Sequence, residues 1–69
     1  MQFDYLLNEG QKGSLQIFDL TGRMISQYEL SQDAQSIFIS EEFLNSGVYL
    51  YRYFVDGEMI NSEKLIILK

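Results

Sequence analysis

The chain has 69 residues, a net charge of −5, and neither histidine nor cysteine. That length allows one small domain with limited buried surface. The missing residue types exclude disulfide frameworks, thiolate metal sites and the commonest general base. The acidic balance argues against binding to nucleic acids or anionic membranes, because both require basic patches. An apolar content of 46% argues against disorder, so the composition indicates a small folded domain without catalytic equipment.

Alternating apolar and polar residues predict four strands in the first 39 residues. Alternate residues of a strand point to opposite faces, so the pattern also predicts which side chains face the core. The predicted strands are residues 2–7 with Phe3, Tyr5 and Leu7 inward, residues 14–19 with Leu15 and Ile17 inward, residues 23–30 with Met24, Tyr28 and Leu30 on one face and Ile25 on the other, and residues 35–39 with Ile37 and Ile39 inward.

A tight turn is predicted where the second strand ends, at residues 19–22. The Asp19 carboxylate can accept a hydrogen bond from the backbone N–H two residues further on. Gly22 can adopt a left-handed conformation because it has no Cβ to clash. Both residues are therefore predicted to be structural turn residues.

One short helical turn is predicted at residues 40–45. Ser40 can cap the first N–H groups, and Glu41 and Glu42 suit the positive end of the dipole. Six residues allow about one turn, which would place Phe43 or Leu44 on the core.

A long antiparallel hairpin is predicted for the C-terminal third of the chain. Residues 46–55 are rich in Val, Leu, Phe and Tyr, as strands are. Asp56 and Gly57 tolerate the positive φ of a type I′ turn, and residues 58–68 return. The faces do not sort cleanly into apolar and polar, which a β-bulge, or burial at one end only, would explain. A two-residue loop predicts the pairs Val55 with Glu58, Phe54 with Met59, Tyr53 with Ile60, Tyr49 with Lys64 and Val48 with Leu65, and places Arg52 diagonal to Glu63.

Six strands with turn signals every 8–12 residues and no long helix favour an all-β sandwich or barrel. The terminal segment, residues 64–69, has a lysine at each end. It is predicted to be either a core strand or an edge strand that its lysines guard against unwanted pairing. Both ends of the chain lie in strand patterning, so we expect a segment of a longer protein, or one that is complete only at its C-terminus.

No catalytic or metal site stands out. Glycosidase chemistry needs two carboxylates across a cleft, and the ten acidic residues are scattered. The Asp-x-Asp spacing of an EF-hand loop is absent. Tyr49, Tyr51 and Tyr53 allow three interpretations: an aromatic platform for a sugar or peptide, a strand buried on both faces, or a tyrosine tucked near a sandwich corner. Gly47 is interpreted as a close approach of two backbones.

Three segments occur in an informative order: residues 15–25 (LQIFDLTGRMI), residues 45–52 (NSGVYLYR) and residues 62–69 (SEKLIILK). Together they resemble the C-terminal sorting domain of the type IX (Por) secretion system of Bacteroidetes. That family reads hydrophobic-Tyr/Phe-Asp-hydrophobic-Thr-Gly-Arg, then Leu-Pro-Ser-Gly-Val-Tyr, then Lys-Leu-Ile/Val close to the end of the protein. The order, the intervening lengths and the ending agree over nearly the whole chain.

The resemblance implies an immunoglobulin-like antiparallel β-sandwich that acts as a C-terminal sorting signal. The cargo would enter the periplasm by an N-terminal signal peptide outside this chain and be recognised at the outer membrane by the translocon. A sortase-like peptidase would then remove the domain, leaving the cargo secreted or on the cell surface. The residues that match the signal-bearing motifs are Gly47, Tyr49, Lys64, Leu65, Ile66, Ile67 and Lys69, and Gly22 matches the turn glycine.

Two departures from the family pattern bear on these expectations. Asn45 stands where the family has proline, and the upstream Asn-Pro segment with the first strand is missing. We therefore expect residues 1–69 to form one sorting domain of six strands out of seven. A missing strand would leave an unpaired edge through which the isolated domain could form a homodimer. The competing interpretation is an immunoglobulin-like or fibronectin-like accessory module that binds carbohydrate or protein through its tyrosines.

Overall fold

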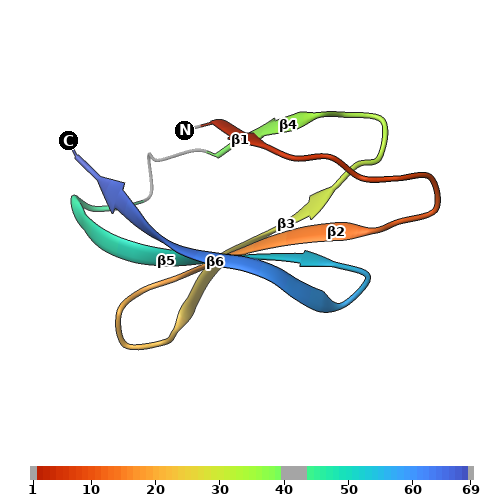
Figure 1. Ribbon diagram of the computed structural model, residues 1–69. Coiled ribbons are helices and arrows are strands. Elements are labelled where there is room, and N and C mark those ends of the chain that lie inside the picture. Colours follow the sequence, from red (N-terminus) through yellow and green to blue (C-terminus); the bar gives the residue numbers. More distant parts are fainter. Residues whose placement is uncertain (1, 40–43, 69) are drawn as a thin grey trace.

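A computed structural model describes residues 2–39 and 44–68, and shows two antiparallel β-sheets (Figure 1). The smaller sheet pairs β1 with β4, and the larger sheet has the order β3-β2-β5-β6. The strands are β1 (Gln2–Asp4), β2 (Gly13–Phe18), β3 (Met24–Leu30), β4 (Ser36–Phe38), β5 (Gly47–Val55) and β6 (Glu58–Ile67). The prediction of an all-β chain with six strands is confirmed for the described residues.

The two sheets lie one above the other and share a single apolar core (Figure 1). Tyr5 and Leu7 follow β1 and meet Leu15 and Ile17, which are fully buried in the central strand β2. As predicted, Ile37 and Ile39 also face this core, as does Phe3. Alternation within the strands therefore identified most of the residues that hold the two layers together.

The helical turn predicted for residues 40–45 is not seen in the part that the structure describes. Residues 40–43, including Ser40, Glu41, Glu42 and Phe43, lie outside the described residues, and neither Leu44 nor Asn45 is helical. Leu44 nevertheless packs on the core with 4% of its surface exposed. The predicted apolar contact is therefore present at Leu44 without a helix in the described residues.

A β-bulge overturns the predicted facing of β3 at Met24 and Ile25, whereas Tyr28 and Leu30 share the core face as predicted. Ile17 pairs with Ser26 and Phe18 pairs with Met24, so the ladder skips Ile25. One extra residue reverses the alternation beyond it. Ile25 consequently packs against the core, whereas Met24 lies on the opposite face with 44% of its surface exposed.

A second bulge shifts most of the predicted hairpin register by one residue. The pairs of Val55 with Glu58 and Phe54 with Met59 are as predicted, but Tyr53 pairs with Asn61 because the ladder skips Ile60. The remaining predicted pairs are therefore wrong: Tyr49 pairs with Leu65, Leu50 with Lys64 and Val48 with Ile66. The β-bulge, one of the two explanations for the uneven faces, is present. Arg52 and Glu63 fall on opposite faces, so their predicted diagonal pair is also wrong.

Gly13, which precedes the strand predicted at residues 14–19, has a packing role that the sequence interpretation missed. It begins β2 and is buried. A Cβ at this position would lie 3.2 Å from both methyl carbons of Leu7 and 3.3 Å from the Cβ of Leu30. Glycine therefore lets the segment after β1 pack closely over the start of β2.

Candidate functional site

The motif residues in the middle and at the end of the chain are direct neighbours in the sheet. Gly47 pairs with Ile67 and Tyr49 pairs with Leu65 across β5 and β6. Phe18, the last residue of β2, pairs with Leu50, so the turn after it lies at the same end of the sheet. All three motif segments thus gather at one end of the four-stranded sheet, on the left in Figure 1.

The entry to β5 depends on the backbone of Gly47 and on the ring of Tyr49. Gly47 has φ +157°, which residues with side chains rarely adopt, and an added Cβ would meet nothing within 4 Å. The interpretation of Gly47 as a close backbone approach is therefore wrong; its backbone conformation is the reason for glycine. The hydroxyl of Tyr49 donates a hydrogen bond of 2.7 Å to the carbonyl oxygen of Asn45. A tyrosine that bonds back to the chain just upstream fixes the path by which that chain enters the strand.

The terminal motif divides between the two faces of β6. Leu65 and Ile67 are core residues with 7% and 1% of their surface exposed. Lys64 is exposed, and Ile66 exposes 60% of its surface on the opposite face. Lys69 lies outside the described residues. Of the two interpretations of this segment, the edge strand is correct, because β6 pairs only with β5 among the described strands.

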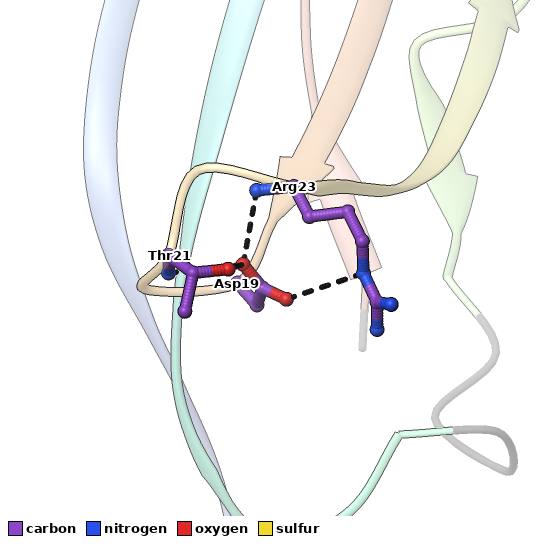
Figure 2. Close-up of polar contacts among 3 residues, drawn as sticks. All are labelled: Asp19, Thr21 and Arg23. Carbon is purple, nitrogen blue, oxygen red and sulfur yellow. Dashed lines mark hydrogen bonds and ion pairs between the residues drawn. The ribbon is translucent and has the colours of Figure 1, made fainter.

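The Asp19 turn is held by its own side chains (Figure 2). One carboxylate oxygen of Asp19 accepts hydrogen bonds from the Thr21 hydroxyl at 2.6 Å and from the backbone N–H groups of Thr21 and Arg23, both at 3.0 Å. The other oxygen lies 3.5 Å from Nε of Arg23. The Thr21 hydroxyl, followed by the backbone N–H of Arg23, holds the pKa of Asp19 below its usual value. Gly22 has φ +92° and donates to the Asp19 carbonyl oxygen at 3.1 Å.

The Asp56–Gly57 turn lies at the opposite end of the sheet, beside the start of β2. Asp56 and Gly57 have φ of +51° and +81°, the left-handed values that a type I′ turn requires. The backbone N–H of Asp56 donates to the Lys12 carbonyl oxygen at 2.8 Å, and the Asp56 carboxylate accepts from the Lys12 N–H at 3.0 Å. This turn therefore joins the hairpin to the loop before β2 and lies away from the motif residues.

The tyrosines of β5 do not form an open platform. Tyr49, Tyr51 and Tyr53 are half-buried and pack against the core. The Phe3 ring meets Tyr51 and Tyr53 edge-on, with interplanar angles of 72° and 61°. The Tyr51 hydroxyl donates to a Glu63 oxygen at 2.9 Å; burial, together with this carboxylate, raises the pKa of Tyr51. Coplanar exposed rings, which a carbohydrate platform needs, are therefore absent from this strand.

Neither a metal site nor a membrane helix is found in the part of the chain that the structure describes. Residues 2–39 and 44–68 contain no group of three or more acidic side chains placed to hold a metal ion. The same residues include no helix long and apolar enough to cross a membrane.

The sequence interpretation missed an exposed apolar surface on the far side of the large sheet. Phe18 pairs with Met24 on one side and with Leu50 on the other, and Leu50 pairs with Lys64. Directly paired residues share a face, so these four form a row across all four strands. Val48 and Ile66 form the next row. We call these six residues the outer patch. Alternation shows that each faces away from the core, but only the strand order brings them together.

A comparison with protein families identifies what kind of domain this is. The model of a family described as the secretion system C-terminal sorting domain matches residues 2–68, which is nearly the whole chain. Searches among curated proteins and among solved structures returned no significant match. The family match confirms the resemblance carried by the three motif segments. The chain therefore belongs to the secretion system C-terminal sorting domain family, whose members are C-terminal sorting signals for type IX secretion.

Proposed function

We propose that this domain is a folded, non-catalytic label that the type IX translocon reads to export a cargo joined to its N-terminal side. A protein that carries such a sorting signal is secreted or held at the cell surface. The observation that supports the proposal best is β6, a free edge strand anchored by Leu65 and Ile67 and exposing Lys64 and Ile66. A label read by a machine needs a stable fold and an accessible strand rather than a pocket.

Under this proposal the motif residues have two kinds of role. Lys64 and Ile66 are available to a partner, and Lys69 is proposed to act with them. The other motif residues, Gly47, Tyr49, Leu65 and Ile67, act by building the end of the hairpin on which the exposed residues are presented.

The test is the localisation of a fluorescent reporter in a bacterium with a type IX secretion system. The reporter carries an N-terminal signal peptide and this domain at its C-terminus, and its control lacks the domain. We expect the first protein at the cell surface or in the medium and the second in the periplasm. A strain without the outer-membrane translocon should retain both. Equal periplasmic retention of both reporters in the competent strain would contradict the proposal.

Deleting residues 64–69 would be a poor control for this experiment. The deletion removes two core side chains, Leu65 and Ile67, which together with the rest of β6 cover the motif end of β5. Loss of export would then report loss of the fold as well as loss of a signal. Substitutions at exposed positions of β6 avoid this ambiguity.

Processing by a sortase-like peptidase also belongs to the proposal. The domain would be cut from the cargo after export, so that the cargo reaches the surface or the medium without it. Immunoblotting of the exported reporter at both of its ends tests this step. Exported reporter that keeps the domain at full length would contradict it.

The expected seventh strand has a place to pair under the same proposal. β1 and β4 form a sheet of only two described strands, each with an open edge, and two-stranded sheets alone are marginally stable. A strand from upstream residues would enlarge this sheet toward an immunoglobulin-like sandwich. Homodimerisation of the isolated domain through that edge stays a prediction. Light scattering that finds a monomer at every concentration would contradict it.

The half-buried tyrosines count against the competing accessory binding module. Tyr51 and Tyr53 contact Phe3 and the core, so little of either ring face is free to stack on a sugar. The sorting label is therefore the function that we retain.

A further inference from the structure

The exposed half of the terminal motif belongs to a larger surface, the outer patch. Its apolar members Met24, Val48 and Ile66 expose 44%, 37% and 60% of their surface. Phe18 and Leu50 fill the space between them and are half-buried. Exposed apolar side chains that adjoin across neighbouring strands are typical of an interaction surface.

The charge of this face differs from that of the whole protein. Arg52 lies on it with its guanidinium carbon 4.7 Å from the centre of the Phe18 ring, and Lys64 lies at its edge. Among the strand residues that the structure describes, the one carboxylate on this face is that of Glu29, which pairs at the level of Ser14 and Phe54, at the other end of the sheet. A chain with net charge −5 therefore presents a cationic, apolar area beside its free edge.

The free edge of β6 indicates what shape of partner fits. Beyond the bulge, residues Asn61–Ile67 pair with β5 without a further shift, so the strand is regular over this stretch. An edge strand presents unpaired backbone N–H and C=O groups to any chain that can lie beside it. The opposite edge, β3, is bulged at Ile25, and bulges blunt an edge against such pairing.

Resting on the proposed function, we infer that a β-strand of the type IX machinery adds to β6 along Asn61–Ile67 and extends the outer patch. Its backbone would pair with the free edge, as in other complexes formed by strand addition. Its side chains beside Ile66 would be apolar, and one beside Lys64 would be a carboxylate. Leu65 and Ile67 would meet this partner through their backbone, because the alternation of β6 points their side chains into the core.

The first experiment compares single substitutions on the exposed face of β6 in the exported reporter. Ile66→Lys places a charge in the patch, and Lys64→Glu reverses the charge at its edge. Met59→Lys is the matched control, because Met59 is a comparably exposed apolar residue of the same strand (53%) at the distant end of the sheet. We expect Ile66→Lys and Lys64→Glu to lower the export rate about tenfold or more and Met59→Lys to leave it unchanged. Thermal unfolding of each purified domain should match the wild type.

Each outcome of this comparison decides the inference. Export of Ile66→Lys and Lys64→Glu at the wild-type rate would overturn it and leave the sorting function intact. Equal loss of export for Met59→Lys would overturn it too, since the effect would then not belong to the patch. Failure of the wild-type reporter itself to leave the periplasm would overturn the sorting function and, with it, this inference.

Photo-crosslinking tests the chemistry of the occupant. p-Benzoylphenylalanine replaces Ile66 in one reporter and Met59 in another, and cross-linked peptides are identified by mass spectrometry. We expect the probe at residue 66 to join a translocon segment in which apolar residues alternate with at least one aspartate or glutamate. A basic or helical segment would overturn the assignment. A cross-link to a second copy of this domain would assign the patch to a dimer instead.

Discussion

Ile66 and Ile67 are adjacent, chemically identical residues to which the fold gives opposite environments. Ile67 has 1% of its surface exposed and packs in the core opposite Gly47, whereas Ile66 has 60% exposed beside Val48. A short motif on an edge strand therefore holds two sets of residues. One set keeps the strand in the sheet, and the other is available to a partner. Loss of function after mutation cannot distinguish the sets unless stability is measured alongside.

The largest expected effect comes from truncating the buried member of this pair. Ile67→Ala should lower the free energy of unfolding by about 2–5 kcal/mol, because it leaves a cavity under the end of the hairpin. Ile66→Ala, with the same change one residue earlier, should alter it by less than about 0.5 kcal/mol. Urea unfolding followed by circular dichroism measures both. Equal losses for the two variants would contradict the opposite facing of these side chains.

Alternation predicted much of the core but could not predict the bulges. Leu15, Ile17, Ile37 and Ile39 face inward as expected, because no bulge intervenes in their strands. Ile25 was assigned to the wrong face, because the skipped residue depends on how neighbouring strands pack rather than on local composition.

The motif residues of the candidate site could be named from the sequence, but their arrangement in space could not. The three motif segments were recognised as a resemblance, and the structure places them at one end of the sheet. The bulge at Ile60 then decides which partner each motif residue meets. The outer patch was missed because Phe18 and Leu50 become neighbours only through the pairing of β2 with β5, which are not consecutive in the chain.

The next effect concerns Gly47, which supports the buried set through its backbone. Gly47→Ala should lower the free energy of unfolding by about 1–3 kcal/mol, because an L-residue is strained at φ +157°. A chemically synthesised chain with D-alanine at this position is the control, since D-residues favour the mirror-image φ range. The D-alanine chain should unfold close to the wild type in urea. A loss of the same size for both chains would indicate steric contact rather than backbone strain.

A smaller effect is expected at the hydroxyl of Tyr49, which fastens the chain where it enters β5. Tyr49→Phe removes the hydrogen bond to Asn45 and keeps the ring, so it should cost about 0.5–1.5 kcal/mol. Tyr28→Phe is the matched control, because Tyr28 is also half-buried and its hydroxyl bonds to no other group among the described residues. If both variants lose the same stability in urea, the bond to Asn45 does not stabilise this corner.

The smallest effect is the pH dependence that comes from Asp19, whose carboxylate holds the turn after β2. Its pKa is lowered in the folded domain by the Thr21 hydroxyl and the Arg23 N–H, so the ionised carboxylate favours folding. That stabilisation is present above the unfolded pKa, about 3.9, and is lost as the pH falls through the folded pKa.

Asp19→Asn should therefore unfold at a lower urea concentration than the wild type at pH 7, and the gap between the two unfolding midpoints should close as the pH falls below 4. The other carboxylates are the same in both proteins, so this difference isolates Asp19. A gap that stays constant down to pH 2 would mean that the asparagine disturbs the turn by its shape and that the charge of Asp19 contributes nothing. Export of the variant is measured where both proteins are fully folded. A wild-type rate would show that this turn acts by stabilising the fold, as Ile67 does, and not by contact with a partner, as proposed for Ile66.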